Sequence, residues 1–217
     1  FMIFSNNGER CTAGSRILVQ KSLYADFAAK FAERAKRITV GDPLDPNTIV
    51  GPMISQGHLA KVRSYIELGP REGATLLCGG LGQPELPQHV KKGNFVLPTV
   101  FADVDNRMRI AQEEIFGPVL VIIPYEDDED AIRIANESQY GLSGGVSSAD
   151  HARAMRIACA TFASPSAAPR PRARAAKAAP GATRCSASRR TWPCRWATTT
   201  SRTGAIDSPP FTHPRSL

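Results

Sequence analysis

The sequence feature that most constrains the fold is an uninterrupted apolar run, Val-Leu-Val-Ile-Ile, at residues 119–123. A strand with one face in water alternates apolar and polar residues, whereas a strand buried on both faces is apolar throughout. Strands of the second kind occur mainly in parallel sheets that helices cover on both sides. The run therefore predicts one sheet with helices on both of its faces.

Strands and helices are expected to alternate around this run. Short apolar stretches typical of strands lie at residues 16–20, 74–78, 93–101 and about 140–146. Patterns typical of amphipathic helices lie at residues 21–37, 55–69, 126–136 and 150–158. The first helix has an apolar stripe at Leu23, Phe27, Phe31 and Ala35, and Pro98 restricts the third stretch to an edge or an end of the sheet. The alternation predicts an α/β fold with a largely parallel sheet and flanking helices over residues 1–158.

Charge divides the chain into two parts. Residues 1–150 contain 15 Lys and Arg against 19 Asp and Glu, a net charge of −4. Residues 151–217 contain 12 Lys and Arg against one acid, Asp207, a net charge of +11, and the two parts sum to the +7 of the whole chain. The basic character therefore belongs to the C-terminal tail and not to the predicted globular part.

Several classes of protein are disfavoured by the sequence. No apolar run is long enough to span a membrane, and no cleavable signal is visible. Five cysteines and four scattered histidines show neither a disulfide pattern nor the spacing of a metal site. We therefore expect a soluble, cytoplasmic protein with no bound metal and no membrane partner.

Cys11 is the candidate nucleophile. A lone cysteine is more often a small buried hydrophobe than a catalytic group. Here, however, Arg10 precedes the thiol and favours its thiolate form. The small residues 12–15 that follow allow backbone N–H groups to approach a bound oxyanion. The local sequence thus suggests a reactive thiol without establishing one.

Five ordered segments together resemble the catalytic domain of the NAD(P)-dependent aldehyde dehydrogenases. They are the Cys11 segment at residues 1–16, Gly-Pro-Met-Ile-Ser at 51–55, residues 93–101, Glu-Glu-Ile-Phe-Gly-Pro at 113–118, and Ala-Asn at 135–136 with Tyr-Gly-Leu at 140–142. Within this family, residues 6–16 and 65–70 are most similar to the branch that oxidises 5-carboxymethyl-2-hydroxymuconate semialdehyde in the breakdown of 4-hydroxyphenylacetate through homoprotocatechuate.

The resemblance implies a role for three residues. Cys11 matches the nucleophile that forms a thiohemiacetal and then a thioester with the aldehyde carbon. Glu114 matches the carboxylate that binds the nicotinamide ribose, and Phe116 matches the aromatic residue beside the nicotinamide ring. The implied cofactor is NAD, with NADP as the alternative. The implied partners are a small-molecule aldehyde and further copies of the chain, because the family forms homo-oligomers.

Parts of the family pattern have no counterpart in residues 1–217. In the family, a dinucleotide-binding domain, a general-base glutamate and an oxyanion-hole asparagine all precede the cysteine, whereas here only ten residues do. We therefore expect an N-terminally truncated fragment that is inactive by itself. Glu9 lies too close to Cys11 in the chain to replace the missing base.

The tail at residues 159–217 departs from the family pattern altogether. Codons for residues 165–179 can be chosen so that the neighbouring frame encodes Pro-Phe-Gly-Gly-Thr-Lys-Ala-Ser-Gly-Thr-Gly-Arg-Glu-Gly-Gly, which is the family motif expected there. The tail is therefore interpreted as a frameshifted translation. Because its composition lacks patterned apolar residues, we expect the tail to be disordered.

Two other functions are compatible with the sequence. A basic nucleic-acid-binding module would use the arginine-rich tail, and its binding would weaken steeply with salt. In that case a gel shift would be lost on deletion of residues 159–217. A catalytically dead interaction protein would instead associate with intact subunits through an exposed sheet edge, and it would co-purify with them.

The frameshift interpretation predicts the nucleotide sequence of the gene. Sequencing should show that the frame next to the one encoding residues 165–179 contains the Pro-Phe-Gly-Gly motif. A gene that uses other codons there, so that the neighbouring frame lacks this motif, would rule the interpretation out.

Overall fold

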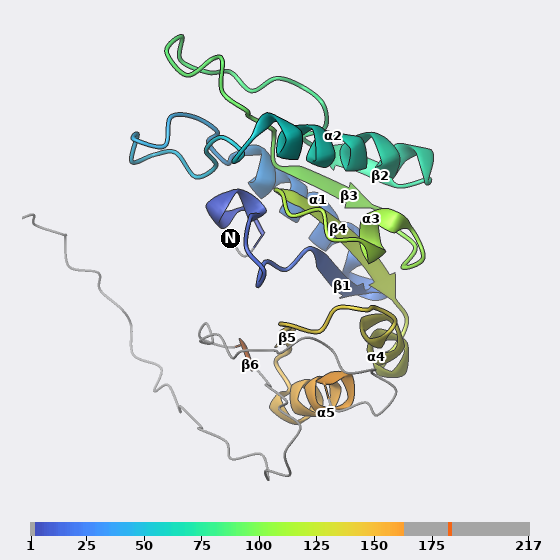
Figure 1. Ribbon diagram of the computed structural model, residues 1–217. Coiled ribbons are helices and arrows are strands. Elements are labelled where there is room, and N and C mark those ends of the chain that lie inside the picture. Colours follow the sequence, from blue (N-terminus) through green and yellow to red (C-terminus); the bar gives the residue numbers. More distant parts are fainter. Residues whose placement is uncertain (1–2, 163–181, 184–217) are drawn as a thin grey trace, which may run out of the picture.

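The computed structural model describes residues 3–162 and 182–183 (Figure 1). The predicted frameshift and disorder of the tail concern residues that lie almost entirely outside this range. Two parts of the predicted tail are described. Residues 159–162 continue a helix, and residues 182–183 form a short strand.

A four-stranded mixed sheet forms the centre of the structure. Its strands are β1 (Arg16–Gln20), β2 (Thr75–Cys78), β3 (Thr99–Ala102) and β4 (Val119–Tyr125), in the order β1-β4-β3-β2. β1 and β3 pair with β4 in parallel, and β2 pairs with β3 antiparallel. The α/β fold with a largely parallel sheet is therefore confirmed.

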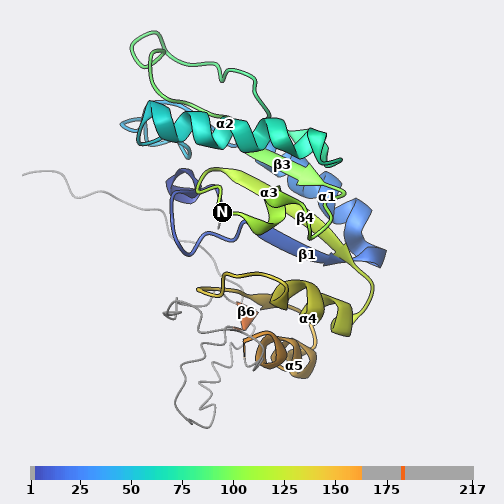
Figure 2. The same ribbon diagram turned by 45° about the vertical axis from the view of Figure 1, so that its right-hand side comes forward.

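The apolar run in β4 is buried on both faces, as predicted. Val119, Val121 and Ile123 belong to one hydrophobic cluster, whereas Leu120 and Ile122 belong to another. Helix α2 (Gln56–Arg71) contributes to the first cluster, and helix α1 (Lys21–Lys36) to the second. The two helices lie on opposite sides of the sheet (Figure 2).

The inner face of α1 differs from the predicted stripe. Its buried residues are Ala28, Ala32 and Ala35, with Phe27 and Phe31 partly buried beside them. Leu23 is 63% exposed, so the expectation that it belongs to the buried stripe is wrong. The alanines face the sheet because their small side chains permit close helix–sheet contact.

Helix α2 begins as predicted and ends slightly later. The Ser55 side chain accepts a hydrogen bond from the His58 backbone N–H at 3.1 Å, which is an N-cap. Pro70 lies inside the last turn. The Glu72 N–H then closes that turn on the carbonyls of Leu68 and Gly69. A proline in the last turn removes only one helical hydrogen bond, so the helix continues to Arg71.

β3 is shorter than the stretch predicted at residues 93–101. It begins directly after Pro98, where the Thr99 N–H donates to the Pro118 carbonyl at 2.9 Å. Proline has no N–H to donate within the sheet, so Pro98 lies just outside the N-terminal end of β3. An end of a strand is one of the two positions expected for it.

A further group of elements lies beside β1 (Figure 1). It consists of α4 (Asp128–Asn136), β5 (Val146–Ser147), α5 (His151–Phe162) and β6 (Ala182–Thr183). The short helix α3 (Arg109–Gln112) lies instead between β3 and β4 in the sequence and contacts α2. The Asp127 side chain caps α4 by accepting from the Asp130 N–H at 2.9 Å. None of the helices in the described part of the chain has the length and apolar content needed to cross a bilayer.

The close approach of α2 to the sheet gives a stability prediction. A Cβ added at Gly69 would lie 2.7 Å from the Phe101 ring, so Gly69→Ala should destabilise the fold by about 1–3 kcal/mol through overpacking. In the same helix, a Cβ at Gly57 would meet nothing within 4 Å. Gly57→Ala should therefore be neutral or stabilise by up to about 1 kcal/mol. Urea unfolding midpoints would measure both, and shifts of the same sign would contradict the packing described here.

Candidate active site

The sheet topology brings two segments that are distant in sequence to one edge. β1 and β4 are parallel neighbours, with Arg16 paired to Val121. Cys11 lies five residues before β1, and Phe116 lies three residues before β4. Adjacent parallel strands begin at the same edge of a sheet. The loops that carry Cys11 and Phe116 therefore both reach the sheet at that edge.

Cys11 lies in a tightly turned and exposed loop. The Ala13 N–H donates to the Arg10 carbonyl at 3.0 Å and closes a turn around the cysteine, whose side chain is exposed. By contrast, Cys78 is buried, and this burial raises the pKa of its thiol. Of these two cysteines, Cys11 is the one that a substrate could reach.

The loop before Cys11 contacts the segment before β4 through backbone atoms. Gly8 ends a short 3-10 turn (Ser5–Gly8) and has a φ of 71°, in the region that favours glycine. A Cβ at Gly8 would lie only 2.2 Å from the Gly117 carbonyl oxygen. Only glycine at position 8 allows the nucleophile loop and the Phe116 segment to approach so closely.

Two side chains fix the nucleophile loop to residues 51–54. Asn7 accepts from the Gly51 N–H at 2.8 Å and donates to the Pro52 carbonyl at 3.0 Å. The Glu9 carboxylate accepts from the Ile54 N–H at 3.2 Å, and its side chain is only 15% exposed. Glu9 therefore has a structural role in the loop.

Glu114 and Phe116 lie on the neighbouring segment. Glu114 is exposed, and its carboxylate makes no hydrogen bond or ion pair with any other residue in the range 3–162. An available carboxylate acceptor fits the hydroxyl groups of a ribose. Phe116 is half-buried with a φ of 60°, which is unusual for a bulky residue. These residues are thus compatible with a nucleotide cofactor.

A polar cluster supports the residue next to Glu114. The Glu113 carboxylate accepts from the Arg109 guanidinium at 2.7 Å and from the Tyr65 hydroxyl at 2.6 Å. The Arg109 and Tyr65 hydrogen bonds lower the pKa of Glu113 to about 2. The hydrogen bond to Glu113 raises the pKa of Tyr65 to about 12. This cluster connects α2 and α3 directly before the predicted cofactor residues.

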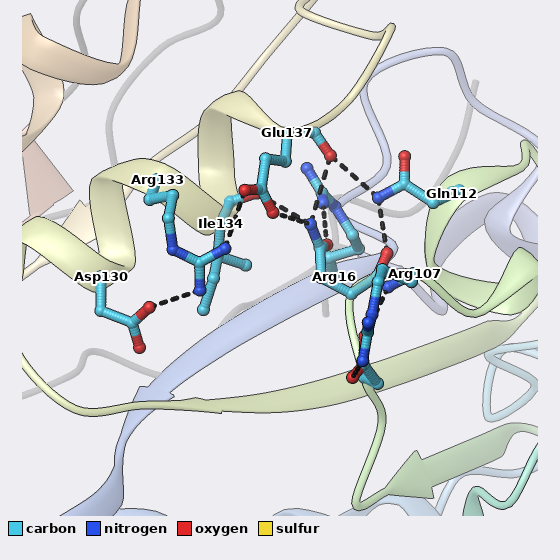
Figure 3. A network of polar contacts seen from close by, with 9 residues as sticks. Arg16, Arg107, Gln112, Asp130, Arg133, Ile134 and Glu137 are labelled. Atoms are coloured by element: carbon cyan, nitrogen blue, oxygen red, sulfur yellow. Dashed lines mark hydrogen bonds and ion pairs between the residues drawn. The ribbon is translucent and has the colours of Figure 1, made fainter.

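A second network ties β1, α3 and α4 together (Figure 3). The buried Asn106 side chain accepts from Arg16 at 2.7 Å and donates to the carbonyls of Ile134 and Glu137 at 3.4 and 3.2 Å. Gln112 donates to the carbonyls of Asn106 and Glu137 at 2.6 and 2.8 Å. The network satisfies carbonyls that the end of α4 leaves unpaired, and it holds the start of β1 against the helix before Glu114.

Several of these residues were not predicted as part of the site. Their contacts join residues that are far apart in the sequence, and no local pattern indicates such contacts. These residues are Asn7, Asn106 and His58. His58 lies in α2, and its ring contacts both segments of the site.

Comparison with known sequences finds aldehyde dehydrogenases in each case. The model of the aldehyde dehydrogenase family matches residues 1–171. The 5-carboxymethyl-2-hydroxymuconate semialdehyde dehydrogenase of Escherichia coli is 59% identical over 159 residues, which are 73% of this chain and 34% of that protein. The betaine aldehyde dehydrogenase of Brucella anthropi is 46% identical over 154 residues, 71% of this chain and 31% of that protein. The chain thus spans about a third of the length of these curated relatives.

Solved structures match the same region. HpcC from Thermus thermophilus superposes with a TM-score of 0.70 at 52% identity, covering 74% of this chain and 32% of that one. A Mycobacterium tuberculosis aldehyde dehydrogenase complexed with NAD+ has a TM-score of 0.69 at 46% identity, with 73% and 32% covered.

The Glu113 cluster predicts a pH dependence of stability. A carboxyl whose pKa falls from its ordinary 4.5 to about 2 on folding stabilises the fold fully above pH 4.5 and loses this effect as the pH falls through 2. Glu113→Gln should therefore lower the free energy of unfolding at pH 7, and the difference from wild type should vanish near pH 2.

The control for this variant is Glu67→Gln, which removes an exposed carboxylate 3.8 Å from Arg71 on the same helix α2. Such exposed pairs contribute little, so its effect should be small at every pH. Urea unfolding between pH 7 and pH 2 would measure both variants. A difference for Glu113→Gln that does not change with pH would contradict the assignment.

Proposed function

Because this chain belongs to the aldehyde dehydrogenase family, as its sequence motifs suggested, we propose that it forms the nucleophile-bearing part of an enzyme that oxidises an aldehyde to a carboxylic acid. One observation carries this proposal. The exposed Cys11 loop and the Glu114–Phe116 segment are joined by the backbone contact between Gly8 and Gly117. This contact supports the proposal, because the predicted nucleophile and the residues predicted to contact the cofactor lie on segments that touch each other.

Cys11 supplies the covalent chemistry in this proposal. Its thiolate attacks the aldehyde carbon and forms a thiohemiacetal, whose oxygen carries the negative charge. The backbone N–H of Cys11 is proposed to stabilise this oxyanion. Loss of hydride from the same carbon leaves a thioester on Cys11, and water hydrolyses it to the carboxylic acid and the free thiol.

Glu114 and Phe116 are proposed to bind the cofactor. When bound, NAD supplies the hydride acceptor. The free carboxylate of Glu114 would accept hydrogen bonds from ribose hydroxyls, and the Phe116 ring would orient the nicotinamide. A solved relative from Mycobacterium tuberculosis is an NAD+ complex, which supports NAD for this site, with NADP as the alternative.

The proposed substrate is 5-carboxymethyl-2-hydroxymuconate semialdehyde, an intermediate of aromatic catabolism. The support is the 59% identity to the Escherichia coli protein that is named for this substrate. Homo-oligomer formation and a cytoplasmic location are proposed from the family alone. The nucleic-acid-binding alternative depends on the basic tail, nearly all of which lies outside the described residues, and no observation favours the interaction-protein alternative.

A chimeric enzyme tests the proposed role of Cys11. The matching third of the Escherichia coli relative would be replaced by residues of this chain, and NADH formation from the semialdehyde would be followed by absorbance. The chimera should be active, and Cys11→Ser should reduce its kcat by about three orders of magnitude or more, because the nucleophile is lost.

Cys78→Ala is the matched control, since this buried thiol has no proposed part in the reaction. It should leave kcat within about a factor of two, which is the scale of a small change in packing. Equal activity of Cys11→Ser and the unsubstituted chimera would refute the assignment of the nucleophile.

The 217-residue chain by itself should produce no detectable NADH with NAD and the semialdehyde. The expected reason is that none of its residues matches the family's general base or dinucleotide-binding fingerprint. Measurable NADH formation by the purified chain that is lost in Cys11→Ser would overturn this expectation.

A further inference from the structure

His58 lies between the two segments of the proposed active site. Building on the proposed function, we propose that His58 is a positioning residue that holds the Cys11 loop and the Phe116 segment in a fixed relative position. Neither the family match nor the sequence motifs assign a role to this histidine.

The contacts of the imidazole ring join both segments. Its Nε2 lies 2.6 Å from the Phe116 carbonyl oxygen and 3.4 Å from the Glu9 Oε1. Glu9 is two residues before Cys11, and Phe116 is two residues after Glu114. The His58 and Glu9 side chains are both only 15% exposed, so water competes little for these contacts.

The two acceptors determine which nitrogen of the His58 ring must carry a hydrogen. A carbonyl oxygen and a carboxylate oxygen can only accept hydrogen bonds, so Nε2 must carry a hydrogen to bind either one. A neutral imidazole has a single N–H group. The contacts therefore require the Nε2–H tautomer, or the protonated ring, whose Nε2 also carries a hydrogen.

Phe116 needs such support because of its backbone conformation. Its φ of 60° lies in the left-handed region, which bulky residues adopt only when their surroundings hold them there. The His58 ring contacts Phe116 twice, through the hydrogen bond to its carbonyl and through an edge-to-face ring contact with centroids 6.0 Å apart. The hydrogen bond holds the Phe116 backbone, and the ring contact favours one orientation of its side chain.

His58 is itself fixed by a rigid element. Its backbone N–H donates to the Ser55 Oγ in the N-cap of α2, and Val62 on the next turn is fully buried against the sheet. One turn further from the cap than His58, Lys61 donates to the Glu114 carbonyl at 2.9 Å. Helix α2 thus holds the Phe116 segment through His58 and Lys61, and its Val62 packs against Gly117. Of these three residues, His58 is the one that also contacts the nucleophile loop.

Hydrogen exchange of the 217-residue chain tests this role without any need for turnover. The readout is the exchange rate of peptides that contain the hydrogen-bonded amides of Glu9, Ile54 and Val119. In His58→Leu these peptides should exchange about 5–10-fold faster, because the Phe116 carbonyl loses its hydrogen bond and Glu9 loses its contact with the ring. His58→Gln, whose side-chain amide can donate in the same direction, should return the rates to within about twofold of wild type.

His89→Leu is the matched control, because His89 is an exposed histidine that binds Asp42 at 2.7 Å and contacts neither segment. It should leave these peptides unchanged. Unchanged exchange in His58→Leu would overturn the proposal. Equal acceleration in His58→Leu and His58→Gln would also overturn it, since the hydrogen bond would then not be the cause.

Nitrogen NMR of the wild-type chain gives a second readout that does not depend on any variant folding. The imidazole shifts of His58 should report a hydrogen on Nε2. An Nδ1–H tautomer would overturn the proposal. Because neither experiment measures aldehyde oxidation, loss of the proposed function and loss of this positioning role can be told apart.

Discussion

The structure depends on the removal of both faces of β4 from water. Each of residues 119–123 is at most 3% exposed, and burial of a side chain of this size contributes about 1.5–3 kcal/mol. Neither face of such a strand can be left uncovered, so α1 and α2 must lie on opposite sides of it. Both edges must be paired as well, and β1 and β3 supply these pairs in parallel orientation.

The candidate site follows from this arrangement. Ligands of open α/β sheets usually bind beyond the carboxyl ends of the strands. Here the predicted site residues precede β1 and β4 and therefore lie at the opposite edge. At that edge the chain enters the sheet, so these loops come before the residues that strand pairing holds in place. Their conformation must come from contacts between loops, which explains the polar contacts of Asn7, Glu9 and His58.

The sequence predicted the parts of the fold that depend on local periodicity. The run at residues 119–123, the Ser55 cap and the start of β1 all have signals within a few residues, and each is confirmed. On α1, Ala35 is buried as predicted, whereas the buried Ala28 and Ala32 lay outside the predicted stripe, because small residues that fit against a sheet give little apolar signal in a sequence. The Asn106 side-chain contacts with Arg16, Ile134 and Glu137 and the His58 contacts join residues 28 to 90 positions apart. They therefore depend on the completed fold and not on local pattern. The roles of Cys11, Glu114 and Phe116 stay predictions that rest on family resemblance.

The contact between Gly8 and Gly117 makes the spacing of the two segments sensitive to a single residue. At Gly8 and Gly117 the nucleophile loop and the Phe116 segment meet backbone to backbone, so a side chain at position 8 would force them apart. Gly8 therefore limits the variation that this part of the chain can tolerate. Even alanine, the smallest substitution, would place a Cβ 2.2 Å from the Gly117 carbonyl oxygen and separate the two segments.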